Sequence, residues 1–332
     1  MSISKNFINK VKSVVIGHAV ADALGVPVEF MTREELKAHP VTDMMGYGTY
    51  PLPKGCWSDD TSMSLCALDA MHDGKINFDE VMLNFAKWYC QDEYTPTGEM
   101  FDVGNTCSIA IERYLKDGFP WSKCGLSGEM DNGNGSLMRI HPFALYAFQQ
   151  NTNFRTKMEI VELASALTHA HPRSKIACGM YACILWELLT WGEFIDIKTC
   201  VRTGIFRAHQ YYESTPFKCE LSHFSKLYYQ IANGKNGIPS VTEEDIVSDG
   251  YVVHSLEAAI WCLLTTNSYR ECVLKAVNLG DDTDTVAAIA GGLAGAFYGY
   301  DAIPQEWLDT LLKREYIEKL CEKAFAKNSN NG

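Results

Sequence analysis

The stretch VNLGDDTDTVAAIAGG, residues 277–292, joins a dense group of acids to a run of small and apolar residues. Asp281, Asp282 and Asp284 fall within four positions, and Thr285 follows them. Carboxylates this close repel one another, whereas the run AAIAGGLAGA after them is of the kind that a protein buries. The pattern predicts a buried helix over Val286–Phe297, with Asp282 and Asp284 in a non-helical lead-in that presents its acids to a site.

Helical patterns continue outward from this stretch through most of the chain. Clear strand patterns are almost absent, and Tyr251-Val252-Val253 is the best short candidate. The sequence therefore predicts an all-α protein, a single compact domain of many helices packed orthogonally over residues 1–327, with a frayed polar tail at 328–332. Apolar residues recurring every three or four positions predict helices over 7–25, 60–71, 78–89, 160–167, 176–191, 256–264 and 307–327.

Composition narrows the class of protein. The chain has 332 residues, 47% of them hydrophobic, and a net charge of −12, which argues against non-specific binding to nucleic acid. Twelve cysteines occur without a CxxC pair or zinc-type spacing, as expected for reduced thiols. We see neither a signal peptide nor an uninterrupted apolar run of about 18 residues. We expect a soluble, cytoplasmic protein without a membrane span.

Acids also gather at the ends of two other predicted helices. Glu29 follows the glycine- and alanine-rich helix GHAVADALG, and Ser58, Asp59 and Asp60 open the helix that begins near residue 60. Taken singly, these are an exposed glutamate and an ordinary N-cap. Together with Asp282 and Asp284, they make five carboxylates, which need protons or cations if folding brings them together. Oxygen ligands suit Mg²⁺ or Mn²⁺, and five carboxylates favour two ions.

Two further motifs leave alternatives open. The segment GEMDNGNGSLMRIHP, residues 128–142, contains a loop whose backbone N–H groups can cradle phosphate oxygens, although Asn-Gly pairs also simply form turns. The run Asp282-Thr283-Asp284-Thr285-Val286 fits the nucleophile loop of haloacid-dehalogenase-type phosphatases. Only 46 residues follow Val286, however, and they are helical in pattern, which leaves too little chain for the sheet of that fold.

Six motifs in a fixed order resemble the ADP-ribosylglycohydrolases, the family that includes the dinitrogenase-reductase-activating glycohydrolase. The resemblance extends from about residue 10 to about residue 300. It rests on GHAVADALGVPVEF (17–30), WSDDTSM (57–63), FDVGNT (101–106), GNGSLMR (133–139), LTHAHPRS (167–174) and NLGDDTDTVAAIAGGLAGAFYG (278–299).

The resemblance implies an all-α fold with a dinuclear magnesium cleft, in which Mn²⁺ is an alternative ion. By motif position, Glu29 is the general base toward water, and Asp102 orients the ribose or the leaving group. The implied metal ligands are Ser58, Asp59, Asp60, Asp282, Asp284 and Thr285. The implied substrate-binding residues are Asn132, Gly133, Asn134, Gly135, Ser136 and, beside Thr168, His169. His169 also fits a hydrogen-bonded core histidine.

The implied function is a Mg²⁺-dependent hydrolase that removes ADP-ribose from modified protein side chains, with arginine as the first linkage to consider. Its partners would be an ADP-ribosylated protein and ADP-ribose. A non-catalytic crystallin-like or ADP-ribose-binding relative, and a hydrolase of small ADP-ribosyl compounds, are the alternatives. Ser58 stands where the family more often has Thr, which keeps the hydroxyl. Asp281 stands where the family usually has Gly, and we expect this extra acid to crowd the site.

Overall fold

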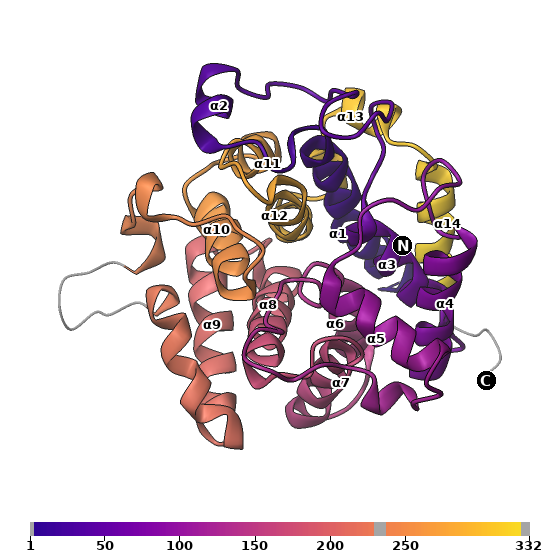
Figure 1. Cartoon of the computed structure of the whole chain (residues 1–332). Coiled ribbons are helices and arrows are strands. Elements are labelled where there is room, and N and C mark those ends of the chain that lie inside the picture. Colours follow the sequence, from indigo (N-terminus) through magenta and orange to yellow (C-terminus); the bar gives the residue numbers. More distant parts are fainter. Residues whose placement is uncertain (1–2, 229–236, 327–332) are drawn as a thin grey trace.

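Helices form almost all of the regular structure in the part of the chain that the computed structural model describes, residues 3–228 and 237–326 (Figure 1). The strands β1 (Met71–His72) and β2 (Lys75–Ile76) make one short antiparallel hairpin. The prediction of an all-α protein is confirmed. The α-helices are α1 (Ile3–Gly25), α2 (Arg33–Ala38), α3 (Asp59–Asp69), α4 (Phe78–Gln91), α5 (Asn105–Leu115), α6 (His141–Gln149), α7 (Phe154–Ala166), α8 (Pro172–Trp191), α9 (Ile197–Glu213), α10 (Val252–Leu264), α11 (Tyr269–Val277), α12 (Thr283–Tyr298), α13 (Gln305–Thr310) and α14 (Arg314–Phe325).

The centre of the molecule is the antiparallel pair α1 and α12, which lie side by side although they come from opposite ends of the chain (Figure 1). Glycines let the two backbones approach closely. A methyl group on Gly291 would lie 2.5 Å from the carbonyl oxygen of Gly17, and one on Gly25 would lie 2.3 Å from Cα of Asp284. These distances leave no room for a side chain. The C-terminal end of α1 therefore meets the N-terminal end of α12.

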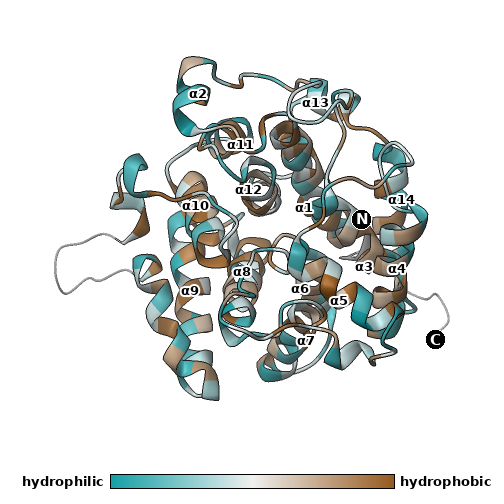
Figure 2. Ribbon diagram, viewed as in Figure 1, coloured by the Kyte–Doolittle hydropathy of each residue, from teal (hydrophilic) through white to brown (hydrophobic). Residues whose placement is uncertain are grey.

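The outer helices bury one face against their neighbours, as α9 does against α8. On α9, Val201, Ile205 and Ala208 are buried, whereas Phe206 is 58% exposed, and Figure 2 shows the mixture of hydrophilic and hydrophobic residues on this helix. The second half of α1 is apolar. An 18-residue window within residues 6–28 has a mean hydropathy of 1.4, enough by length and composition for a membrane span. That window is 94% buried within the fold, as expected for a core helix.

Two predicted elements are wrong in detail. Tyr251, Val252 and Val253 do not form a strand: Tyr251 is the N-cap of α10 and makes only an isolated bridge to Gly133. The helix predicted over 307–327 is broken into α13 and α14, because Lys313 adopts a left-handed conformation with φ 51° between them. The predicted tail at 328–332 lies outside the described residues, and the single-domain boundary remains a prediction.

Candidate metal centre and substrate loop

The acids of the opening stretch lie at the start of α12. The helix begins at Thr283, earlier than predicted, so Asp284 and Thr285 belong to its first turn and only Asp282 precedes it as the N-cap. The Thr283 hydroxyl donates to the carbonyl oxygen of Gly25 at 2.9 Å, which ties this end of α12 to the end of α1. The side chain of Asp284 is thereby held inside the protein, with only 1% of the residue exposed.

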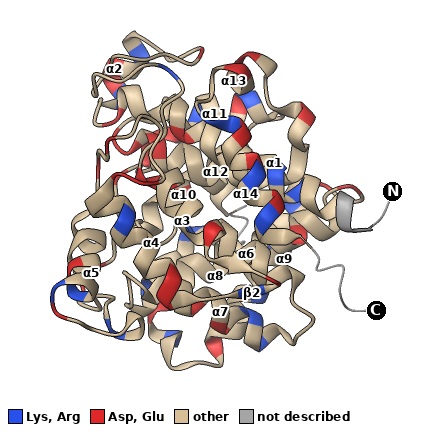
Figure 3. Cartoon of the chain, turned by 90° about the vertical axis from the view of Figure 1, so that its right-hand side faces the viewer, with Lys and Arg blue, Asp and Glu red and all other residues tan. Residues whose placement is uncertain are grey.

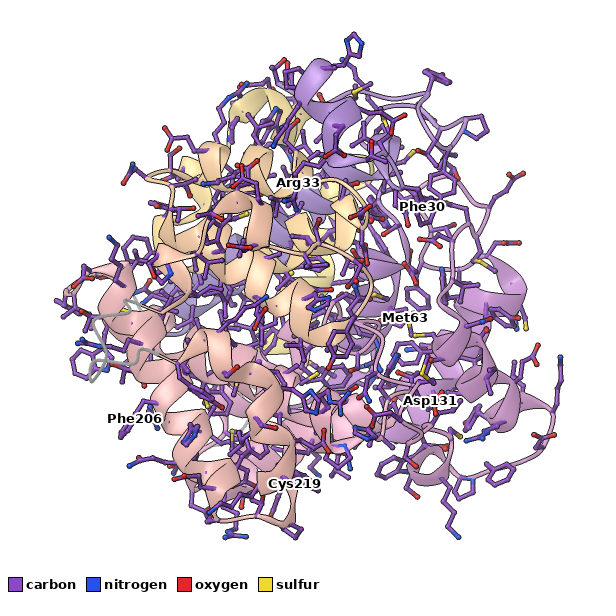
Figure 4. All side chains as sticks on the ribbon, turned by 60° about the vertical axis from the view of Figure 1, so that its left-hand side comes forward. Phe30, Arg33, Met63, Asp131, Phe206 and Cys219 are labelled. Atoms are coloured by element: carbon purple, nitrogen blue, oxygen red, sulfur yellow. The ribbon has the colours of Figure 1, made fainter. Side chains whose placement is uncertain are left out.

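The loop before α12 is fixed by one arginine. Arg33, labelled in Figure 4, donates from Nε to the carbonyl oxygen of Leu279 at 2.8 Å. Its Nη1 and Nη2 donate to the carbonyl oxygens of Glu243 and Ile246, at 2.6 and 2.7 Å. A guanidinium group has five N–H donors in a rigid fork, so it can hold several carbonyls at once. These hydrogen bonds therefore fix the position of the loop that leads to Asp282.

The acids of the second motif lie at the start of α3, and Asp22 of α1 orients them. Ser58 is the N-cap, and its side chain accepts a hydrogen bond from the backbone of Asp60. Asp22 accepts from the backbone N–H of Ser58 at 2.9 Å, and from the backbone N–H and hydroxyl of Thr61 at 3.1 and 2.6 Å. The sequence analysis did not select Asp22. Its position one turn after His18, on the tightly packed face of α1, was the available signal.

Oxygen atoms from these elements converge in two groups. Asp22, Asp60 and Asp284 each offer an oxygen within 4.8 Å of the others, and so do Glu29, Asp102 and Asp284. The Thr285 hydroxyl lies 3.3 Å from Oδ1 of Asp60. Figure 3 shows acidic residues gathered beside α10 and α12. Asp284 belongs to both groups, so the two potential cation positions share a ligand.

Burial and mutual repulsion raise the pKa values of these acids. Burial, followed by the charge of Asp102, raises the pKa of Glu29 to about 8. Burial raises the pKa of Asp22 to about 6. Burial, followed by the charge of Asp282, raises the pKa of Asp102 to about 6 as well. For the same reasons, the pKa values of Asp59, Asp60 and Asp284 lie well above the usual range of aspartate. Burial alone raises the pKa of Asp282, against hydrogen bonds that lower it.

One oxygen in the cluster is without a partner. Oδ2 of Asp60 is buried and makes no hydrogen bond with any described residue. A buried carboxylate oxygen left in this state is costly unless a cation satisfies it. Carboxylate and hydroxyl oxygens are the ligands that hard divalent cations prefer. The donor set therefore fits such an ion.

Glu29 and Asp102 face the cluster from irregular segments. Glu29 is 5% exposed, and its Oε2 accepts a hydrogen bond from the hydroxyl of Tyr50 at 2.8 Å. Asp102 has a left-handed backbone with φ 53°, a conformation that costs energy in most residues and that aspartate tolerates better than most. Tyr50 also packs against Phe101, with ring centroids 5.0 Å apart. Tyr50 was missed by the sequence analysis because it lies in a loop without a periodic pattern.

Asp281 does not crowd the site, contrary to expectation. Its residue is exposed, and its backbone is left-handed with φ 60°. Its N–H donates to the carbonyl oxygen of Met31, and its carbonyl oxygen accepts from the N–H of Phe30, both at 2.8 Å. Left-handed backbone is the natural place for glycine, which aspartate can replace at modest cost. Aspartate is tolerated at position 281 because it accepts the left-handed turn. Its exposed side chain does not belong to the acid cluster.

The predicted substrate loop lies beside the cluster, but its side chains are largely engaged within the protein. Asn134 donates through Nδ2 to Oδ2 of Asp282 at 2.6 Å and to the hydroxyl of Ser255 at 2.9 Å. Asn132 accepts from Ser174 at 3.0 Å, and Ser136 from Ser165 at 3.1 Å. These bonds leave the backbone of Gly133 and Gly135, both partly exposed, as the part of the loop that a ligand can approach.

His169 packs directly under this loop. A methyl group on Gly135 would lie 3.0 Å from Cε1 of His169, so the imidazole ring is in contact with the glycine. The ring is 2% exposed, and burial with the nearby Arg139 charge lowers its pKa to about 3, which keeps it neutral. Its Nδ1 lies 2.8 Å from the hydroxyl oxygen of Thr168. His169 is both a hydrogen-bonded buried histidine and a neighbour of the substrate loop.

The all-α fold brings carboxylates from α1, α3, α12 and two loops together, and this arrangement defines a helical protein with an acid cluster that fits metal ions. The model of the ADP-ribosylglycohydrolase family matches residues 3–332, and the chain therefore belongs to this family and is a glycohydrolase. The family is metal-dependent, in agreement with the two acidic groups.

Curated relatives and a solved structure agree with this assignment. The chain is 33% identical to the ADP-ribosylarginine hydrolase Tri1 of Serratia proteamaculans, over 96% of this chain and 79% of the relative. It is 31% identical to the ADP-ribosyl-[dinitrogen reductase] glycohydrolase of Rhodospirillum rubrum, over 89% and 88% of the two chains. A solved structure described as an ADP-ribosylglycohydrolase-related protein complex superimposes with a TM-score of 0.75 and 27% identity, covering 97% of this chain and 98% of its own.

We expect Asp22→Asn to weaken metal binding without unfolding the protein. An amide at this position replaces one acceptor oxygen by a donor that faces the N–H groups of Ser58 or Thr61, which reorients the start of α3. A change of this kind around a metal site lowers metal affinity or activity by roughly 10- to 100-fold. Titration of thermal stability with Mg²⁺, together with turnover, measures both effects. Thr61→Val removes only the hydroxyl contact and should have a smaller effect; equal losses in the two variants would contradict the role of Asp22.

Proposed function

We propose that this protein is a Mg²⁺-dependent hydrolase that releases ADP-ribose from modified arginine side chains of proteins. The observation that carries the proposal is the buried acid cluster with the unpartnered Oδ2 of Asp60. The relatives named as ADP-ribosylarginine hydrolases support the arginine linkage. Two Mg²⁺ ions, with Mn²⁺ as a substitute, would be held by Ser58, Asp59, Asp60, Asp282, Asp284 and Thr285.

When bound, the ions would supply positive charge that binds ribose hydroxyls and makes a nearby water more acidic. The protein's own residues would accept the proton from water and orient the substrate. Oε2 of Glu29 is occupied by the Tyr50 hydroxyl, whereas Oε1 accepts no hydrogen bond from the described residues. Bound cations would lower the pKa of Glu29 and keep it ionised, and Oε1 would then be suited to take a proton from the attacking water. Asp102, within 4.8 Å of Glu29 through its nearest oxygen, would orient the ribose or the leaving group.

The proposed reaction is a single hydrolysis at C1 of the distal ribose. The water oxygen forms a bond to C1 while the bond from C1 to the guanidino nitrogen breaks. Glu29 takes one proton from the water and passes it to the leaving guanidine, which becomes the free arginine side chain, while the hydroxyl stays on C1. Positive charge develops on the sugar during this step, so the surrounding carboxylates favour it. Backbone N–H groups of Gly133 and Gly135 would hold the diphosphate, with His169 beneath them.

Turnover on a set of defined linkages tests the proposal. Proteins or peptides carrying ADP-ribose on arginine, serine or a carboxylate are incubated with the enzyme, in the presence of Mg²⁺ and in the presence of a chelator. We expect release from arginine only with Mg²⁺. Release from serine alone, or release that a chelator does not affect, would contradict the proposal; cleavage of free ADP-ribosyl compounds without cleavage of proteins would redirect it to small substrates.

The raised pKa values predict an unusual pH dependence of stability. Glu29 has a pKa of about 8 in the folded protein and a usual value of 4.5, so the folded state retains a proton that the unfolded state has released. The free energy of unfolding of the metal-free protein should therefore fall as the pH rises from about 4.5 to about 8. Thermal unfolding in a chelator at several pH values measures this decline. Glu29→Gln should flatten it, saturating Mg²⁺ should oppose it, and a rise in stability over that range would contradict the assignment.

We also propose that the protein works in the cytoplasm. All twelve cysteines are free, and ten of them are buried, which suits a reducing compartment. Its expected partner is an ADP-ribosylated protein. The net charge of −12 argues against non-specific binding to nucleic acid. Fractionation of cells that produce the protein would test the location.

A further inference from the structure

A buried arginine lies below the substrate loop. Arg139 is fully buried and forms no ion pair with the described residues. Its Nη2 donates to the hydroxyl oxygen of Thr168 at 2.7 Å, and its Nη1 donates to the carbonyl oxygen of Ala164 at 3.2 Å. The guanidinium carbon also lies 4.9 Å from the ring centroid of Phe85. These contacts fix the orientation of the group.

The hydroxyl hydrogen of Thr168 has two acceptors within reach, Nδ1 of His169 and the thiol of Cys107. Arginine can only donate, so the oxygen of Thr168 is the acceptor in its bond with Arg139. The hydroxyl hydrogen of Thr168 is then available for Nδ1 of His169, 2.8 Å away. A nitrogen that accepts carries no hydrogen, and a neutral imidazole then carries its hydrogen on the other nitrogen. Donation from Thr168 to Nδ1 makes His169 the tautomer with N–H at Nε2, the nitrogen beside the glycine loop.

The N–H of His169 faces the glycine loop. A methyl group on Gly133 would lie 3.6 Å from Nε2, and one on Gly135 would lie 3.5 Å from the same atom. Among the described residues, none forms a hydrogen bond with Nε2. The loop glycines leave the space beside Nε2 open, where any larger residue would fill it. A donor is thus directed, without a protein partner, at the place where the loop would hold a ligand.

We propose that Arg139 and Thr168 are positioning residues that set His169 as an N–H donor to a phosphate oxygen of the ADP-ribosyl group. The proposal rests on the proposed function for the identity of the ligand. The tautomer does not depend on that identity. A neutral donor beside glycine N–H groups can bind a diphosphate oxygen without adding a charge that would compete with the cations at the acid cluster. We expect binding to be affected more than the chemical step, because no hydrogen bond joins His169 to Glu29 or Asp102 in the described part of the chain.

The tautomer can be measured without substrate. In the wild-type protein, ¹⁵N chemical shifts of the His169 ring should show an unprotonated Nδ1 and a protonated Nε2. Thr168→Val keeps the shape of the side chain but removes the hydroxyl, so Nδ1 loses its donor and the two tautomers should both be populated. Thr168→Ser restores a hydroxyl and should restore the wild-type spectrum. A wild-type His169 with its hydrogen on Nδ1 would overturn the proposal, whatever the variants do.

Binding of ADP-ribose provides the second readout. We expect Thr168→Val to raise the Kd for ADP-ribose, and the KM for an ADP-ribosylated arginine substrate, by about 10-fold with kcat changed far less, as for the loss of one hydrogen bond. Thr168→Ser should bind as the wild type does. Unchanged affinity in Thr168→Val with an altered tautomer would overturn the ligand contact. Absence of turnover on every linkage would instead count against the proposed function, because the spectrum of His169 is independent of it.

Discussion

Asp284→Asn is expected to reduce Mg²⁺-dependent release of ADP-ribose by about 1,000-fold, which corresponds to about 4 kcal/mol of lost transition-state stabilisation. Asp284 contributes an oxygen to both groups of converging acids, so its loss weakens both potential cation positions. The same change should make the metal-free protein more stable, because burial and the neighbouring acids disfavour the charge at this position. Activity and thermal unfolding with and without Mg²⁺ measure the two opposite effects.

Asp281→Asn is the matched control for this experiment. It removes a charge three residues away, and asparagine accepts the left-handed backbone at that position. Because Asp281 is exposed, we expect activity and the stabilisation by Mg²⁺ to remain near the wild-type values. Equal losses of activity in the two variants would mean that activity depends only on the total negative charge near the start of α12. The assignment of Asp284 as a specific ligand would then be wrong.

Gly25→Ala is expected to lower the free energy of unfolding by about 3 kcal/mol and to remove most Mg²⁺-dependent activity. The backbone of Gly25 has φ −81° and ψ −38°, which alanine adopts readily. Helix propensity alone would therefore favour alanine. The new methyl group would, however, lie 2.3 Å from Cα of Asp284 and 2.4 Å from its nitrogen, so the start of α12 must move. Chemical denaturation and a Mg²⁺ titration report both losses.

Gly104→Ala separates this contact from the general effect of removing a glycine. Gly104 precedes α5 with φ −64°, and a methyl group there meets no other atom within 4 Å. We expect a change within about 1 kcal/mol, as at other N-cap positions that lose glycine. Comparable destabilisation in the two variants would show that the close approach of α1 and α12 is not what requires Gly25.

The parts of the fold with strong local patterns could be predicted from the sequence. The glycine- and alanine-rich run after Asp284 predicted the buried helix α12. The neighbouring acids Asp59 and Asp60 predicted the start of α3. Helices α2, α5, α6, α9 and α11 were not predicted, although α5, α9 and α11 are amphipathic. Tyr251 was mistaken for a strand residue because β-branched neighbours follow it, whereas packing of α10 against the core determined the outcome.

The candidate site was predictable only where a motif gave the residue a visible role. Acids at helix starts could be selected, since several carboxylates exceed what one cap needs. Asp22 was not selected, because the hydrogen bonds that it accepts come from the start of α3, 36 to 39 residues away in sequence. The conformation of Asp281 was equally hidden: its side chain looked like a member of the cluster, and only the left-handed turn accounts for its exposure.

The junction of α1 with α12 has a consequence for how the protein is made. Gly25 and Thr283 are 258 residues apart in the sequence, and Asp60 and Thr285 are 225 residues apart. The acid cluster therefore joins segments that the ribosome synthesises early with segments that it synthesises late. A nascent chain carries Glu29 and Asp60 long before the ribosome has synthesised Asp284. Contacts this distant in sequence form late in folding. The ability to bind metal should therefore arise only in nearly finished chains, and truncated products should remain inert toward ADP-ribosylated proteins.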